Sequence, residues 1–300
     1  MSKNDLSRLV LGTAQLGMSY GIANDAGQPD QKMADAIVEA AWQNSGCEFD
    51  TAQAYGESEI VLGKSLKNLG LTAKAKVISK PSPELSFTEP GSLLSAMNQT
   101  LENLNMESIY GYMFHKADYL EIWDKGLKEQ TEELRARGLA QKIGVSVYSP
   151  EDAVRAVETN GIELIQLPSN IFDRRFENSG VFEKAIDSGK TIYVRSVFLQ
   201  GLMFMDETTL PKYMSFAAPY LEKLDGLVRE SGLSIQELAL GYAAKAYPQA
   251  KILTGAELPE QMNENIAHFN CEFTEELVGK IKRTFSTVPE KILNPVLWGT

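Results

Sequence analysis

The stretch FDTAQAYG at residues 49–56 places a carboxylate and a phenol five residues apart, where an apolar run gives way to a loop. Asp50 lies at the end of the run and Tyr55 lies in the loop. Two later apolar runs also end on single polar residues, Lys80 and His115. An Asp, a Tyr, a Lys and a His at or just after predicted strand ends form a set of groups suited to proton transfer.

Short apolar runs alternate with stretches of helical periodicity along the whole chain. Continuous short apolar runs predict strands buried on both faces, and apolar residues three and four apart predict helices. The predicted strands are residues 8–15, 47–52, 76–80, 109–115, 142–148, 164–170, 191–197 and 251–256. The predicted helices are residues 30–44, a helix beginning at 58, and residues 92–103, 121–137, 150–159, 176–188 and 235–246.

Eight short strands alternating with helices, without an internal linker, predict an α/β fold of the (β/α)8 TIM barrel type in a single domain spanning residues 1–300. A doubly wound open sheet is the alternative, but no Gly-x-Gly-x-x-Gly follows the first strand. In a barrel, Asp50, Lys80 and His115 would come from consecutive strands at their carboxyl ends. The barrel therefore predicts that these side chains converge on one site.

Composition favours a small-molecule ligand. The chain has 300 residues, 43% of them hydrophobic, and a formal net charge of −11. That charge argues against nucleic acid and against anionic membranes as partners. The first residues lack a signal-peptide pattern, and no apolar run approaches the ~20 residues of a membrane span. Cys47 and Cys271, without metal-ligand spacing, are expected to be reduced core thiols of a cytoplasmic protein that has no metal site.

Several short motifs lie at the predicted strand ends. They are LGT at 11–13, FDTAQAYG at 49–56, SK at 79–80, FH at 114–115, IGVS at 143–146, IQ at 165–166, RSVFLQG at 195–201, and the segment from GA at 255–256 to EN at 264–265. In this order and spacing they resemble the aldo-keto reductase family over essentially the whole chain. The resemblance implies an oxidoreductase that transfers a hydride between a nicotinamide cofactor, NADP(H) or NAD(H), and a carbonyl or alcohol substrate such as an aldehyde, a ketone or a sugar.

The four polar residues have distinct expected roles. Reduction of a carbonyl leaves negative charge on oxygen, so a group must donate a proton there, and Tyr55 is the expected donor. A free phenol has a pKa of about 10, so a nearby cation, Lys80, is expected to stabilise its ionised form. Asp50 would keep that buried lysine charged, and His115 would orient the carbonyl. The corresponding residues of aldo-keto reductases have the same roles.

The resemblance also implies contacts with the cofactor. Ser146 and Gln166 would bind the nicotinamide carboxamide, although Val147 stands where the family usually has a second amide. Arg195 stands where many members stack a tyrosine on the nicotinamide. The other implied cofactor contacts are Gly12, Thr13, Ser196, Phe198, Gln200, Gly201, Gly255, Glu257, Gln261, Glu264 and Asn265.

Two parts of the cofactor site leave alternatives open. The segment after Arg195 is interpreted either as a diphosphate-binding loop or as an ordinary surface loop. Residues 255–265 match the family's adenine-binding segment at Glu264 and Asn265, but they lack the basic residues with which many members hold a 2′-phosphate. Glu257 suits a ribose hydroxyl and repels a phosphate, so NAD(H) competes with NADP(H).

The expected substrate pocket is framed by the loop at residues 15–28, with Tyr20, and by Trp298 near the C-terminus. Two other functions are compatible with the sequence. One is a redox-sensing or regulatory subunit that binds the cofactor and turns over slowly. The other is an aldolase-type barrel in which Lys80 forms a Schiff base.

Overall fold

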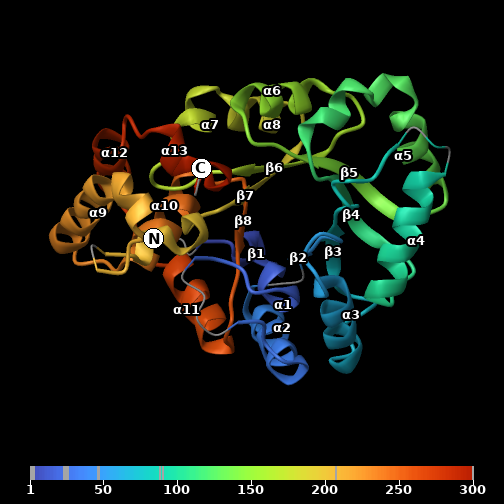
Figure 1. The fold of residues 1–300 in the computed structure, drawn as a ribbon, viewed down its shortest axis with the longest axis horizontal. Helices are drawn as coiled ribbons and strands as arrows, with labels where there is room; N and C mark the ends of the chain where they lie inside the picture. The colour runs from blue at the N-terminus through green and yellow to red at the C-terminus, as the bar shows by residue number, and fades with distance from the viewer. Residues whose placement is uncertain are drawn as a thin grey trace.

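The computed structural model describes residues 4–22, 27–45, 48–87, 89, 91–206 and 208–298. Eight parallel strands form a closed barrel in chain order, and the first strand pairs with the last (Figure 1). The strands are β1 (Leu9–Gly12), β2 (Glu48–Asp50), β3 (Lys76–Ser79), β4 (Ile109–Phe114), β5 (Ala140–Ser146), β6 (Leu164–Pro168), β7 (Thr191–Arg195) and β8 (Lys251–Thr254). The predicted (β/α)8 barrel is confirmed.

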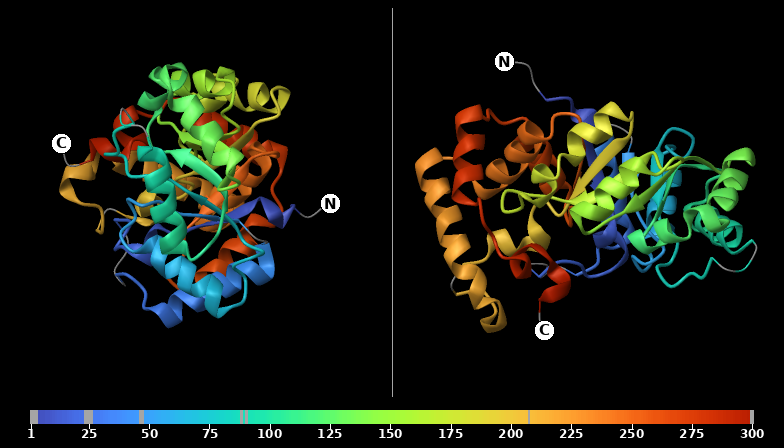
Figure 2. Two further views of the ribbon diagram at one scale, coloured as in Figure 1. Left: turned by 90° about the vertical axis from the view of Figure 1, so that its right-hand side faces the viewer. Right: turned by 90° about the horizontal axis from the view of Figure 1, so that it is seen from above.

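Helices surround the barrel (Figure 2), and α11, α2, α3 and α4 contact one another in turn around its outside. The α-helices are α1 (Ala14–Gly17), α2 (Gln31–Ser45), α3 (Ser58–Asn68), α4 (Ser92–Leu104), α5 (Leu127–Ala136), α6 (Pro150–Glu158), α7 (Arg175–Asn178), α8 (Val181–Asp187), α9 (Ala218–Ser231), α10 (Ile235–Ala246), α11 (Pro259–Phe269), α12 (Glu275–Thr284) and α13 (Glu290–Leu293). The 3-10 helices are η1 (Leu6–Arg8), η2 (Ala117–Glu121), η3 (Trp123–Lys125), η4 (Leu199–Phe204), η5 (Lys212–Ala217) and η6 (Pro295–Leu297). Within the described ranges, no helix combines the length and apolarity that crossing a membrane requires.

Local capping explains why two predicted helices begin where they do. The hydroxyl of Ser149 accepts a hydrogen bond from the backbone N–H of Asp152, and Pro150 occupies the first helical turn of α6. At α10, Ser234 and Glu237 form a capping box in which each side chain accepts the other's backbone N–H.

Two predicted helices are wrong in extent, and glycine is the reason in both. The helix predicted for 121–137 begins only at Leu127, because Gly126 has a φ of 107° and the residues before it form 3-10 turns. The helix predicted for 176–188 is split into α7 and α8 at Gly180, which has a φ of 70°. The expected loop at 15–28 also includes most of α1, and Cys47 lies outside the described residues.

The amino end of the barrel is filled. Tyr193 is fully buried and belongs to a cluster in the barrel interior, which consists of Val10, Ile78, Met113, Leu164, Tyr193 and Leu253. The Tyr193 hydroxyl donates to the carboxylate of Glu48 at 3.0 Å, and Lys251 donates to the same carboxylate at 2.9 Å. Because this end is packed, a ligand site is left to the carboxyl ends of the strands.

Candidate active site

Asp50 and Lys80 form a buried ion pair at the carboxyl ends of β2 and β3. The Lys80 Nζ donates to the two Asp50 carboxylate oxygens at 2.7 and 2.8 Å, and to the carbonyl oxygen of Thr51 at 3.1 Å. Lys80 has no exposed surface and Asp50 is 2% exposed. Burial lowers the pKa of Lys80, and the Asp50 carboxylate acts in the opposite direction. The Asp50 carboxylate therefore favours the protonated form of Lys80 inside the barrel.

The phenol ring of Tyr55 lies over this pair. The Lys80 Nζ is 5.3 Å from the centre of the Tyr55 ring. Burial raises the pKa of Tyr55 well above its ordinary value, the Asp50 carboxylate raises it further, and the Arg195 charge lowers it. Tyr55 is therefore protonated at neutral pH, and it can act as a proton donor.

The loop that carries Tyr55 depends on two glycines. Gly56 has a φ of 58°, and a Cβ at this position would overlap the carbonyl oxygen of Gly17. In turn, a Cβ at Gly17 would overlap the carbonyl oxygen of Tyr55. The backbones of α1 and of the Tyr55 loop can lie this close only because both side chains are absent.

His115 follows β4 beside Tyr55. The two rings meet edge to face, with centres 5.8 Å apart and planes at 87°. Burial lowers the pKa of His115 to about 3, and the positive charges of Lys80 and Arg195 act in the same direction. A neutral imidazole at this position can orient a carbonyl oxygen without repelling the Lys80 ammonium.

A cavity of about 360 Å³ opens at these strand ends. Two of the four proton-transfer residues, Asp50 and Tyr55, line it, and so does Tyr20. The other predicted residues that line it are Gly12, Thr13, Gln166, Arg195, Ser196, Phe198, Gln200, Gly201, Gly255, Glu257, Gln261, Glu264 and Asn265. The structure therefore brings together, around one cavity, residues from β1, β2, β6, β7, β8 and α11.

Four predicted residues do not line this cavity. Lys80 is covered by the pair it forms with Asp50, and His115 reaches the site through its contact with Tyr55. Ser146 is only 2% exposed at the end of β5. Trp298 lies against α13, where its indole N–H donates to the carbonyl oxygen of Lys291 at 3.1 Å, so the expected role of Trp298 as a wall of the pocket is not supported.

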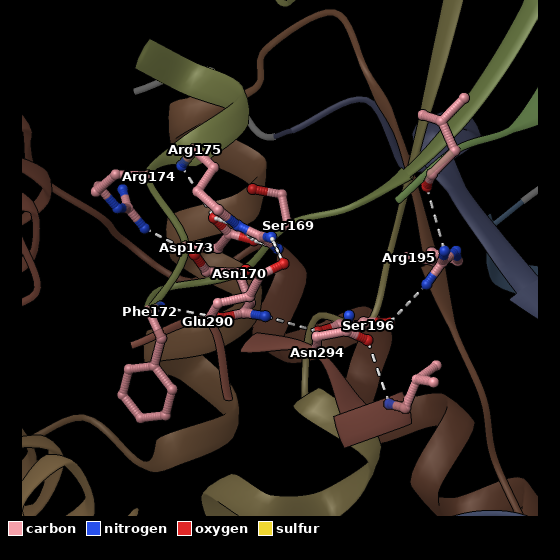
Figure 3. A network of polar contacts seen from close by, with 12 residues as sticks. Ser169, Asn170, Phe172, Asp173, Arg174, Arg175, Arg195, Ser196, Glu290 and Asn294 are labelled. Carbon is pink, nitrogen blue, oxygen red and sulfur yellow. Dashed lines mark hydrogen bonds and ion pairs between the residues drawn. The ribbon is translucent and has the colours of Figure 1, made fainter. Parts of the chain in front are cut away.

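Arg195 is the last residue of β7, and its side chain contacts Ser196 (Figure 3). Its guanidinium donates to the carbonyl oxygen of Val147 and to the hydroxyl of Ser196, both at 3.3 Å. The ring of Tyr148, which the sequence had placed in a strand, faces it, with 4.2 Å between the guanidinium carbon and the ring centre. The loop after β5, through Val147 and Tyr148, and the loop after β7, through Ser196, therefore both hold Arg195 in place.

The loop after β7 has an uncommon backbone. Ser196, Leu199 and Gln200 have positive φ angles of 62°, 49° and 54°, and Gly201 follows at 94°. Within this turn the N–H groups of Leu199 and Gly201 donate to the carbonyl oxygens of Ser196 and Phe198, both at 3.0 Å. Such angles are costly for residues other than glycine and concentrate at ligand sites. Gln200 also accepts a hydrogen bond from the N–H of Ile22 at 3.0 Å, which ties this loop to the loop containing Tyr20.

At α11, the side chain of Gln261 has a structural task. Its amide oxygen accepts from the backbone N–H groups of Glu257 at 2.7 Å and Leu258 at 3.3 Å, and so caps the helix. Asn265 donates to the carbonyl oxygen of Gly255 at 3.2 Å. The charged residues that line this part of the cavity, Glu257 and Glu264, are both acidic.

The cavity residues fit a nicotinamide cofactor. The Thr254 hydroxyl oxygen lies at the cavity wall, is buried, and has no hydrogen-bond partner within the described ranges. It is the kind of group that a polar ligand satisfies. The Gln166 amide nitrogen donates to Asp50 at 2.8 Å, which leaves its carbonyl oxygen to accept from a carboxamide. No group of three His, Cys, Asp or Glu suited to a metal occurs in the part of the chain that the structure describes.

The sequence patterns did not identify Thr254 as a residue of the cavity wall or Tyr148 as a contact of Arg195. Thr254 ends β8 just as Lys80 follows β3, so the rule of a polar residue at the end of a buried run could have identified it. Tyr148 offered no such signal, because an aromatic residue after an apolar run is equally typical of a strand.

The family model described as Aldo/keto reductase family matches residues 8–284. The chain therefore belongs to the aldo-keto reductase family. It is 26% identical to the NADH-specific methylglyoxal reductase of Escherichia coli K12, covering 90% of this chain and 92% of that protein. It is 24% identical to the L-glyceraldehyde 3-phosphate reductase of Escherichia coli O157:H7, covering 92% and 89%. The holo form of aldo-keto reductase AKR11C1 from Bacillus halodurans has the same fold, with a TM-score of 0.73 at 22% identity over 96% of this chain and 95% of that one.

Proposed function

We propose that this protein reduces a small aldehyde or ketone with a nicotinamide cofactor, and that Tyr55 donates the proton. The observation that carries the proposal is the buried unit of Asp50 and Lys80 beneath Tyr55, at the wall of the cavity of about 360 Å³ at the strand ends. When bound, the reduced nicotinamide supplies the hydride.

The chain's own residues account for the proton. The substrate carbonyl oxygen accepts a hydrogen bond from the Tyr55 hydroxyl, and the neutral His115 ring directs it there. As negative charge grows on that oxygen, the proton passes from Tyr55 to it. The phenolate that remains is stabilised by the Lys80 ammonium, which Asp50 keeps protonated. The site is then restored by a proton from water.

We further propose NADH as the preferred cofactor. Glu257 and Glu264 line the α11 side of the cavity, and no basic side chain of the described residues lines that side. A 2′-phosphate would meet negative charge there, whereas a ribose hydroxyl can donate to a carboxylate. The relative described as an NADH-specific methylglyoxal reductase is consistent with this choice.

The test uses Tyr55→Phe, with Tyr213→Phe as the matched control, because Tyr213 is 58% exposed on η5 and does not line the cavity. Oxidation of NADH by methylglyoxal and by glyceraldehyde is followed by absorbance, and cofactor binding by fluorescence titration. We expect Tyr55→Phe to lose on the order of a thousandfold in kcat with cofactor affinity nearly unchanged. Full turnover by Tyr55→Phe would refute the proposed role.

A regulatory subunit with slow turnover is the second candidate. It is favoured by the contact between Gln200 and Ile22, which joins two of the loops that border the cavity and would retard cofactor exchange. A single-turnover experiment separates the two functions. Rapid oxidation of bound NADH followed by slow release of the product cofactor supports the regulatory function, whereas sustained rapid cycles support the reductase.

A further inference from the structure

The cavity has one cationic side chain among the lining residues that the structure describes, and that residue is Arg195. Asp50 also lines the cavity, but its charge is matched by Lys80 at 2.7 Å. Arg195 takes part in no ion pair within the described ranges, and its guanidinium is fixed by two long hydrogen bonds to uncharged oxygens. The two other charged residues that line the cavity, Glu257 and Glu264, lie on its α11 side. The positive charge of Arg195 therefore has no ion-pair partner among the described residues.

This charge lies close to the reacting groups. Arg195 and Tyr55 line the same cavity. The Arg195 charge acts to lower the pKa of Tyr55, against the larger effect of burial, and it also acts to lower the pKa of His115. Hydride transfer requires the nicotinamide ring to touch the carbonyl carbon whose oxygen binds Tyr55. The ring must therefore lie in the same part of the cavity as the Arg195 guanidinium, provided that the proposed reductase function holds.

The position of the Arg195 guanidinium in the cavity wall is also restrained by its neighbours. The ring of Tyr148 covers it at 4.2 Å. The backbone at its base is tied to the loop after β6, because Ser169 donates its N–H to the carbonyl oxygen of Arg195 at 3.1 Å and Asn170 donates to the carbonyl oxygen of Ser196 at 3.2 Å (Figure 3). Asn170 is itself only 1% exposed.

The two redox forms of nicotinamide differ in charge. The reduced ring is neutral and the oxidised ring carries one positive charge. Two unit charges about 5 Å apart, at an effective dielectric constant of about 20, repel one another by an amount equivalent to roughly a few hundredfold in affinity. Arg195 is partly exposed, so solvent reduces this effect, and we expect a factor on the order of ten to a hundred.

We propose that Arg195 selects the redox state of the cofactor, because its fixed charge weakens binding of oxidised nicotinamide and leaves binding of the reduced form largely unaffected. The reaction balances as a hydride from the reduced ring to the carbonyl carbon and a proton from Tyr55 to the oxygen, giving an alcohol and the oxidised cofactor. Repulsion from Arg195 then hastens departure of that product. The same repulsion makes hydride donation by the bound reduced ring less favourable, so Arg195 assists carbonyl reduction only at the step of product release.

The test measures dissociation constants of the reduced and oxidised cofactor by titration calorimetry, for the NADH/NAD⁺ and the NADPH/NADP⁺ pairs. Within each pair the ratio of the two constants cancels any effect of the 2′-phosphate. For Arg195→Gln we expect the ratio of oxidised to reduced constants to fall about tenfold or more, chiefly through tighter binding of the oxidised form. Arg195→Lys keeps the charge and should retain most of the ratio.

Lys116→Gln is the matched control. It also removes one positive charge at this end of the barrel, but Lys116 does not line the cavity, and its ammonium lies 3.6 Å from Glu84 with about half of the side chain exposed. The ratio should not change in this variant. Thermal unfolding midpoints establish that every variant is folded.

A ratio in Arg195→Gln equal to that of the unchanged protein would overturn the inference. Equal weakening of both redox forms is one such result, and it would make Arg195 a contact that does not distinguish them. A rise in KM for phosphorylated but not for neutral aldehydes, at an unchanged ratio, would instead assign Arg195 to the substrate. Failure of the unchanged protein to bind either redox form would refute the proposed function itself, and would be recognised before any variant is compared.

Discussion

Lys80 donates hydrogen bonds to both carboxylate oxygens of Asp50, at 2.7 and 2.8 Å, where Lys80 has no exposed surface and Asp50 is 2% exposed. Each charge depends on the other. Burial lowers the pKa of Lys80, and the Asp50 carboxylate opposes this effect. The electrostatic environment of Tyr55, whose ring lies over the pair, therefore depends on an ion pair that forms only in the folded barrel.

Asp50→Asn breaks this pair. We expect a loss of about 3–5 kcal/mol in the free energy of unfolding, because the substitution leaves a lysine buried without a counter-charge. Turnover should fall as well, since the lysine becomes neutral. Denaturant unfolding and steady-state kinetics measure the two effects. The double variant Asp50→Asn/Lys80→Met should recover part of the stability and none of the turnover. If the double variant is no more stable than the single one, the ion pair is not the cause.

Acid should destabilise the fold through His115. Its pKa is about 3 in the folded chain against an ordinary value of 6.5, so the unfolded chain takes up the proton first as the pH falls. The stabilisation is complete above about pH 6.5 and is lost progressively toward pH 3. In His115→Gln the free energy of unfolding should therefore fall less between pH 7 and pH 4.5 than in the unchanged chain. Equal falls in the two proteins would contradict a neutral, buried His115.

Glu257→Arg should improve NADPH binding by about tenfold, because it replaces repulsion of a 2′-phosphate by attraction. Fluorescence titration with NADPH and NADH gives both affinities. Glu260→Arg is the control, since Glu260 is exposed in the first turn of the same helix and does not line the cavity. An equal gain in both variants would show that net charge alone, and not contact at Glu257, governs the choice.

Gly56→Ala should lower the free energy of unfolding by more than the strain of a left-handed backbone alone. At Gly70, with a φ of 67°, an added Cβ meets nothing within 4 Å, so Gly70→Ala should cost about 1–2 kcal/mol of stability. At Gly56 the added Cβ also overlaps the carbonyl oxygen of Gly17, so the loss should be larger and turnover should fall as the Tyr55 loop shifts. Equal losses of stability in the two variants, measured by denaturant unfolding, would exclude the overlap.

Much of the fold and half of the site follow from short-range rules. Buried parallel strands are continuous apolar runs, so the polar residue after each run marks the strand end, and register in the barrel brings Asp50 and Lys80 together. The resemblance of the motifs to those of the family then predicts most of the residues that line the cavity. Other features depend on contacts between distant segments. The left-handed φ of Ser196 could not be predicted, because glycine is the residue that usually marks such an angle. A hydrogen bond from Asn170, 26 residues away in the chain, accompanies it.

The place of Trp298 also depends on its surroundings. Its indole N–H donates to the carbonyl oxygen of Lys291 in α13, seven residues away, and the sequence does not indicate this contact. The 3-10 turns before α5 likewise follow from the left-handed Gly126, whose effect within an otherwise helical pattern depends on its surroundings.

The pairing of β1 with β8 has a consequence for how the cavity comes into being. Gly12 ends the first strand and Gly255 follows the last, and both line the same space. A chain being synthesised holds Asp50, Tyr55 and Lys80 early, but it cannot close the cavity until β8 has been made. A ligand that binds there stabilises only the closed barrel. Binding of the proposed cofactor would thus report completed folding, and a chain cut between β7 and β8 would carry the proposed catalytic residues with no cavity around them.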